Sequence, residues 1–246
     1  MPIRTTRRGW IIRGVIGTVV LVAVGAVGIP YVYVHFINKP EPRLTFEQRD
    51  AEEAKVADSA GVVDSAGTDV PQGNDVSGTW VVGDGSEIGY RVKESINGQA
   101  TKAVGRSSTM EGSVTVADGK LAAAEFSVDV ATLTSDSARR DGQFTGRIMN
   151  VEEFPVASFA SLSTPDLTLP ADGSTVPISV DGVLTMHGVE KTVTVAVEMR
   201  TKDDTVQIQG SIPVLFADYG ILNPSLGPIK TGDTGLIEFL LTMRKS

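Results

Sequence analysis

Side chains that commonly carry acid–base or nucleophilic chemistry are scarce in this sequence. The chain has no cysteine, so a thiol nucleophile, a disulfide and a thiolate metal site are excluded. It has two histidines. His35 lies near the end of a long apolar run, and His187 falls in an expected hairpin turn, where a polar surface residue is the usual outcome. No group of His, Asp and Glu has zinc-site spacing. We therefore predict no metal and no cofactor.

Two further segments are candidates for catalysis. Gly83–Glu87 reads GDGSE, which lacks the final glycine of a Gly-x-Ser-x-Gly nucleophile elbow. Arg140 and Asp141 are adjacent, and adjacent side chains tend to point apart. A structural ion pair or a cap for helical turns is the better interpretation of that pair. We therefore predict no catalytic residues and no enzymatic activity.

The formal net charge is −8, and its sign changes along the chain. Four arginines (Arg4, Arg7, Arg8 and Arg13) precede a long apolar run, whereas most of the acidic residues follow it. Nucleic acids need clustered lysine and arginine to neutralise their phosphates. The acidic part of the chain therefore argues against nucleic acid as a partner.

The apolar run itself, Gly14 to Ile37, is long enough to cross a bilayer as a helix, which takes about 20 residues. The preceding arginines should stay in the cytoplasm by the positive-inside rule. We therefore predict a basic cytoplasmic tail (1–13), a transmembrane helix (14–37) and an extracytoplasmic C-terminal domain in the cell membrane. The alternative is a cleaved signal peptide with a small-residue site at Ala23–Gly25, which would make the protein secreted.

An acidic linker (38–75) follows the predicted anchor. Thr45–Gln48 fits a capping box, so a short, solvent-exposed helix is expected from about Phe46 to Ala57. Asp58–Asp75 mixes Gly, Ser, Asp and Ala. It is interpreted as a flexible spacer that lets the following domain stand off the membrane, and the whole 38–75 stretch would reach about 30–40 Å as a flexible coil.

Apolar residues recur at period two through the remaining part of the chain (76–246), which is typical of antiparallel strands around one interior. One stretch, 135–151, breaks this pattern and is expected to form a short helical crossing. About eight strands favour an all-β closed barrel, with an open sandwich as the alternative. The residues expected to face the interior are Phe126, Val128, Val130, Leu184, Met186, Val193, Val195, Val197, Ile208, Ile212, Ile237, Phe239 and Leu241.

This inward set carries no charge, and alternation alone leaves its purpose open. An eight-stranded barrel can fill its interior with side chains or hold one slender ligand. On this pattern by itself a dry, filled core is favoured.

Several segments, taken in order, resemble the YceI-like family. Asp129–Thr134 is followed by the Arg140–Asp141 pair, and Lys191 begins the strand after a Gly-x-Leu-Thr-x-x-Gly-Val hairpin. The segments that carry the resemblance are Gly78–Tyr90, Asp129–Thr134, Glu153–Phe159, Gly182–Val189, Asp218–Ile221 and Leu236–Met243. The chain departs from the family pattern at Gln143–Phe144, Ile148–Asn150 and Phe216–Ala217, which affects ligand specificity rather than fold.

The resemblance implies a lipocalin-like antiparallel barrel whose interior holds a long isoprenoid-type lipid, a polyprenol or an isoprenoid quinone, in the cell envelope. The thirteen inward residues then become the predicted ligand-binding set. The alternative is a ligand-free envelope scaffold or interaction domain. Protein partners are not indicated by the sequence.

Overall fold

The computed structural model describes residues 40–60, 76–170 and 172–246. The predicted transmembrane segment (14–37), the basic tail before it and the spacer residues 61–75 lie outside these described residues. Within the described ranges, no helix combines the length and the apolar character needed to cross a bilayer.

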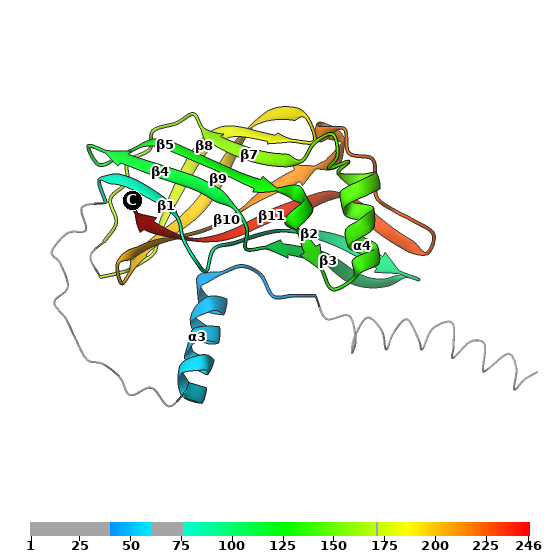
Figure 1. Cartoon of the computed structure of the whole chain (residues 1–246), viewed down its shortest axis with the longest axis horizontal. Helices are drawn as coiled ribbons and strands as arrows, with labels where there is room; N and C mark the ends of the chain where they lie inside the picture. The colour runs from blue at the N-terminus through cyan, green and yellow to red at the C-terminus, as the bar shows by residue number, and fades with distance from the viewer. Residues whose placement is uncertain (1–39, 61–75, 171) are drawn as a thin grey trace, which may run out of the picture.

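The described part is dominated by antiparallel strands (Figure 1). Their bounds are β1 Gly78–Val82, β2 Glu87–Ile96, β3 Gln99–Ser107, β4 Glu111–Ala117, β5 Lys120–Asp129, β6 Thr134–Ser135, β7 Val156–Ser161, β8 Val176–Met186, β9 Val189–Lys202, β10 Thr205–Leu215 and β11 Ile229–Lys245. The helical elements are α3 Phe46–Ala60, η3 Val130–Thr132, α4 Ala138–Gln143, the π-helix η4 Phe144–Ile148 and η5 Phe216–Tyr219.

Eight of these strands close into a barrel in the order β1-β4-β5-β7-β8-β9-β10-β11. Closure depends on the length of β11, which has 17 residues. Its C-terminal end pairs with β1, from Trp80 opposite Lys245 to Val82 opposite Met243. Its earlier part pairs with β2, which continues the sheet into β3 and β6. The predicted all-β barrel of about eight strands with a helical crossing is confirmed for the described residues, and the open sandwich is not formed.

Two tight hairpins show how the local sequence fixes the strand register. Asp118 and Gly119 join β4 to β5 with φ of 52° and 68°, and His187 and Gly188 join β8 to β9 with φ of 51° and 74°. Positive φ at both central residues is the mark of the type I′ turn, which matches the twist of paired strands. The turn at His187 stands where the sequence predicted a hairpin.

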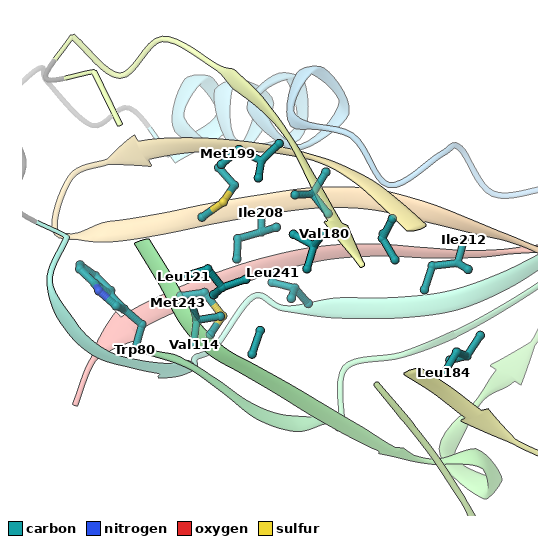
Figure 2. Close-up of a cluster of buried hydrophobic side chains, with 14 of the residues drawn as sticks. Trp80, Val114, Leu121, Val180, Leu184, Met199, Ile208, Ile212, Leu241 and Met243 are labelled. Carbon is teal, nitrogen blue, oxygen red and sulfur yellow. The ribbon is translucent and has the colours of Figure 1, made fainter. Parts of the chain in front are cut away.

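The two ends of the barrel are built differently. At one end, here called the plugged end, Trp80, Leu169 and Met243 pack together in the hydrophobic core, and the Trp80 indole donates to the Val76 carbonyl at 2.8 Å. Figure 2 shows Trp80 and Met243 on this side of the cluster. The opposite end, here called the open end, carries α4, η4, the β2–β3 hairpin and the loop between η5 and β11 (Figure 1).

Helix α3 forms as predicted, and the Gln48 amide donates to Thr45 Oγ1 at 3.3 Å, as a capping box requires. Most of the helix is solvent-exposed, as predicted, but its first turns are attached to the outside of the barrel. Phe46 is only 3% exposed and lies under the Arg200 guanidinium, 4.3 Å from the ring centre. Asp50 accepts two 2.7 Å hydrogen bonds from the same Arg200. The segment from Glu41 to Glu53 is therefore attached to the barrel, so this part of the predicted linker is held in place.

A buried carboxylate joins this segment to the sheet. Glu238 on β11 is 1% exposed and is bound by Arg91 at 3.0 Å, by Arg106 at 2.9 Å and by Arg43 at 2.9 Å. Burial alone would raise the pKa of Glu238. The hydrogen bonds from Arg106 and Arg91 outweigh burial and hold that pKa below its usual value. The cluster therefore stabilises the ionised carboxylate and fixes β2, β3 and β11 to one another.

Candidate binding cavity

A cavity of about 230 Å³ occupies the barrel interior. Nearly all of its wall is aliphatic or aromatic, contributed by strands on every side of the barrel. Figure 2 shows Val180, Ile208 and Leu241 projecting from three different strands into this interior. An apolar wall of this kind can hold an apolar molecule, and a cavity so lined gives water no hydrogen-bond partners.

Twelve of the thirteen residues predicted to face the interior line this cavity: Phe126, Val128, Val130, Leu184, Met186, Val195, Val197, Ile208, Ile212, Ile237, Phe239 and Leu241. Val193 does not line it, although it packs partly buried against the core. Its cross-strand neighbour is Gly182, and the Phe159 ring lies where a side chain at Gly182 would be, within 2.3 Å of that Cβ position. Phe159 therefore faces the cavity at this level in place of Val193.

Aromatic residues that the sequence analysis missed form one wall near the open end. Tyr90 on β2 stacks on Phe144 of η4, with ring centres 4.6 Å apart. Phe144 and Ile148 both line the cavity and are four residues apart, the spacing of neighbours on one helical face. That spacing within the predicted crossing could have identified them. Burial raises the pKa of the Tyr90 phenol, so this hydroxyl stays protonated at neutral pH.

Three polar side chains lie in a row at the open end of the cavity, and the apolar alternation of the sequence did not predict them. Glu94 on β2 lies between Thr101 on β3 and Thr231 on β11 in one cross-strand row. The hydroxyls of both threonines are buried and have no hydrogen-bond partner among the described residues. Burial raises the pKa of Glu94; Asp136 adds to the shift and Arg140 opposes it. The site therefore places a carboxyl, whose protonated form burial favours, in line with two hydroxyl groups at this end of the cavity.

Arg140 and Asp141 hold the helical crossing in place, as predicted, but each binds other residues rather than its neighbour. Asp141 Oδ1 accepts hydrogen bonds from the Ser135 amide at 2.9 Å and from the Ser135 hydroxyl at 2.6 Å. Arg140 forms an ion pair with Asp136, four residues earlier, and also donates to the Ser135 hydroxyl at 3.3 Å. These bonds fix α4 and β6 at the cavity's open end. Arg140 lines the cavity as well, which the sequence analysis did not anticipate.

His187 lies outside the cavity wall. Its Nδ1 is 2.9 Å from the Tyr219 carbonyl, and its ring packs against Phe154 with centres 4.7 Å apart. These contacts join the β8–β9 hairpin to η5. They give the histidine a structural part at the open end of the barrel.

Solved structures share this fold. A polyisoprenoid binding domain from Saccharophagus degradans superposes with a TM-score of 0.55 at 16% identity, over 69% of this chain and 99% of that one. BcnA from Burkholderia cenocepacia gives a TM-score of 0.50 at 22% identity, over 64% of this chain and 95% of that one. At such identities the likeness concerns the fold alone. No match was found among curated proteins.

The sequence itself matches a family model. The model described as the YceI-like domain covers residues 80–243, from Trp80 in β1 to Met243 in β11. That span includes residues of every barrel strand and all the residues that line the cavity. The chain belongs to the YceI-like family.

Proposed function

We propose that this protein is a membrane-anchored binding protein that holds an isoprenoid-type lipid, a polyprenol or an isoprenoid quinone, inside the barrel. The observation that carries the proposal is the unfilled apolar cavity of about 230 Å³. One water-sized position takes about 10–15 Å³, so the cavity offers roughly 15–20 atom positions. That is enough for about three five-carbon isoprene units of a slender chain, with a longer chain extending beyond the open end.

The size of the cavity also argues against the alternative of a ligand-free scaffold. An unfilled cavity in a protein core destabilises the fold by about 24 cal/mol per Å³, which for 230 Å³ is on the order of 5 kcal/mol. A scaffold would gain that stability by filling its interior with larger side chains. A ligand that occupies the space recovers the lost contacts, and the structural neighbour from Saccharophagus degradans is itself described as polyisoprenoid binding.

The polar row at the open end supports an oxygen-bearing head group at this position. The Thr231 hydroxyl and, when protonated, the Glu94 carboxyl can donate to a carbonyl or hydroxyl oxygen, while Arg140 is paired with Asp136 and Ser135. The proposal is therefore one of binding and shielding rather than catalysis. The predicted helix at 14–37 would keep the barrel at the outer face of the cell membrane, where tethered exchange or sensing of such lipids would take place.

The test is lipid analysis of the full chain. The protein is purified from its native host in a detergent that exchanges slowly, and native mass spectrometry measures what it carries. We expect one isoprenoid lipid per chain. A chain that carries no stoichiometric lipid and takes up neither added polyprenol nor added isoprenoid quinone would overturn the proposal. Protease treatment of intact spheroplasts separately tests the anchor, because an extracytoplasmic barrel should be digested from outside while remaining in the membrane fraction.

A further inference from the structure

Exposed apolar side chains gather at the open end of the barrel. Four of the seven large hydrophobic residues that are exposed in the described ranges belong to elements of this end: Leu222 (81% exposed), Leu226, Leu215 and Val156. Leu222 and Leu226 stand on the loop between η5 and β11, Leu215 ends β10 and Val156 begins β7. Several exposed apolar residues at one end of a barrel make that end a candidate interaction surface.

The loop that carries Leu222 and Leu226 is held in place by its own bonds. The Asn223 side chain donates to the Thr231 carbonyl at 3.1 Å and to Asp233 at 2.7 Å. Arg147 of η4 donates to the Pro224 carbonyl at 2.9 Å. Pro224 also lines the cavity. The two leucines are therefore held outward on the rim of the cavity instead of folding over it.

Lysines lie on the outer face of the strands that lead to this rim. Lys93 on β2 stands opposite Lys102 on β3, and Lys230 on β11 stands opposite Ser95. All three lysines are exposed. Asp233, the nearby carboxylate on β11, is bound to Asn223. These lysines on β2, β3 and β11 can face anionic head groups, whereas the exposed carboxylates of Glu152, Glu153 and Asp218 lie on other elements of the same end.

The docked segment before α3 runs toward the same end. The Phe46 amide donates to Gln209, which stands opposite Leu240 of β11. Four residues back along the chain, the Pro42 carbonyl accepts a 2.8 Å hydrogen bond from Arg91, which stands opposite Leu236. Because β11 starts at the open end, the segment approaches the rim as it is followed back toward the N-terminus.

The remaining distance to the rim is short. Arg91 also donates to the Glu41 carbonyl at 2.9 Å, and Glu94 at the cavity's open end is three strand residues, about 10 Å, further along β2. The apolar run ends at Ile37, four residues before Glu41. Four extended residues span at most about 14 Å. An anchor that ends at Ile37 would therefore keep the membrane surface within about 14 Å of Glu41, closer to the barrel than the 30–40 Å expected from a free 38–75 spacer.

We propose that the rim formed by Leu215, Leu222, Leu226 and Val156 docks on the bilayer in which the chain is anchored, with the cavity's open end facing the lipid. The inference draws on the proposed anchor but not on the identity of the bound molecule. Leu222 and Leu226 enter the interfacial region, and Lys93, Lys102 and Lys230 face anionic head groups. The docked segment 40–46 holds the barrel in this orientation.

The test places single fluorophores on the full chain in nanodiscs that hold one copy each. Because the chain has no cysteine, Leu222→Cys and Leu226→Cys each give one labelling site. Leu162→Cys is the matched control, since Leu162 is also exposed (62%) but follows β7 away from the open end. Brominated phosphatidylcholine mixed with phosphatidylglycerol should quench the labels at 222 and 226 and leave the label at 162 unquenched. Adding Leu222→Asp should lower the docked fraction reported at position 226 on the order of tenfold.

Equal quenching at 162 and 222, or none at 222, would overturn the proposal. Protection of the 222 label that appears only in discs holding two copies would overturn it in favour of a contact between chains. Replacing phosphatidylglycerol by phosphatidylcholine should weaken quenching at 222, and an unchanged signal would contradict the contribution of the lysines. Mass spectrometry of lipid bound to the same samples separates the two proposals, because the rim can dock whether or not an isoprenoid fills the cavity.

Discussion

A tryptophan at Val195 should close the middle of the cavity. Val195 lies at the centre of β9, is 3% exposed and lines the cavity opposite Val180. Val195→Trp adds seven heavy atoms, which at about 10–15 Å³ each take a third to a half of the 230 Å³ space. The excluded volume corresponds to at least one five-carbon isoprene unit. Withdrawing such a unit from water contributes on the order of 4 kcal/mol, so uptake of an isoprenoid presented from water or dilute detergent should weaken by about a thousandfold.

The assay measures uptake of an added isoprenoid quinone by the delipidated full chain, followed by native mass spectrometry. Ala196→Trp is the matched control, because Ala196 is the next residue on the same strand and is exposed on the outer face. It introduces the same side chain without entering the cavity, and it should bind as the wild type does. Overpacking in a filled core destabilises by about 1–3 kcal/mol. The unfilled space around Val195 should keep the effect of Val195→Trp at the lower end of that range.

Two results would refute this reasoning. If Val195→Trp keeps the near-ultraviolet circular dichroism of a folded barrel and still takes up lipid with wild-type affinity, the ligand does not occupy the cavity centre. If Val195→Trp unfolds while Ala196→Trp does not, the interior is already filled. In that case Val195→Leu, which adds one carbon, distinguishes an unfilled cavity from a filled core. Its free energy of unfolding should be unchanged or higher beside an unfilled space, and lower in a filled core.

Two further predictions concern buried carboxylates. Glu238→Gln leaves Arg91 and Arg106 without their buried counter-ion, so the free energy of unfolding should fall by about 3–5 kcal/mol at pH 7 in urea denaturation. Because the pKa of Glu238 is held below its ordinary 4.5, this difference should shrink as the pH falls below that value, and a difference independent of pH would contradict the ionised cluster. For Glu94 the pH dependence should have the opposite sign, because burial raises the pKa of its carboxyl above the ordinary 4.5. The wild type should therefore lose stability as the pH rises from 4.5 through that raised pKa. Glu94→Gln, which has no ionisable group at this position, should not show this loss. Parallel unfolding curves for wild type and Glu94→Gln at pH 4 and pH 7.5 would show that Glu94 ionises freely.

The strands and most of the cavity wall could be predicted because their physical cause is local. Alternation at period two decides which side chains face inward, and it placed Ile208, Ile212 and the residues of β11 correctly. The alternation was wrong at Val193, because a side chain from another strand decides what faces the cavity there. The Phe159 ring, which comes from the neighbouring strand β7, lies over Gly182 and takes the place beside Val193.

The docked helix and the polar row could not be predicted for a related reason. Asp50 and Arg200 are 150 residues apart, and their pairing follows from the barrel's closure rather than from either segment. A capping box indicates that a helix forms but not where its apolar face packs. Similarly, Glu94, Thr101 and Thr231 lie on three strands, so the polar row exists only once β2, β3 and β11 are in register.

The position of the open end matters more for such a protein than the affinity of its cavity. An isoprenoid chain in a bilayer is already in an apolar surrounding, so its transfer into an apolar barrel changes the free energy little. Transfer through water, in contrast, has a large free-energy barrier. Exposing about three isoprene units to water at once would cost on the order of 12 kcal/mol, which corresponds to roughly a billionfold slower exchange. A barrel that stands off on a flexible spacer would meet that barrier at each transfer. A barrel whose segment 40–46 is bound to Arg91 and Glu238, with Leu222 and Leu226 at the bilayer, would let the chain slide from lipid to cavity without exposure. In the proposed arrangement the cavity would set how much lipid is held, and the docked segment would set how fast it is exchanged.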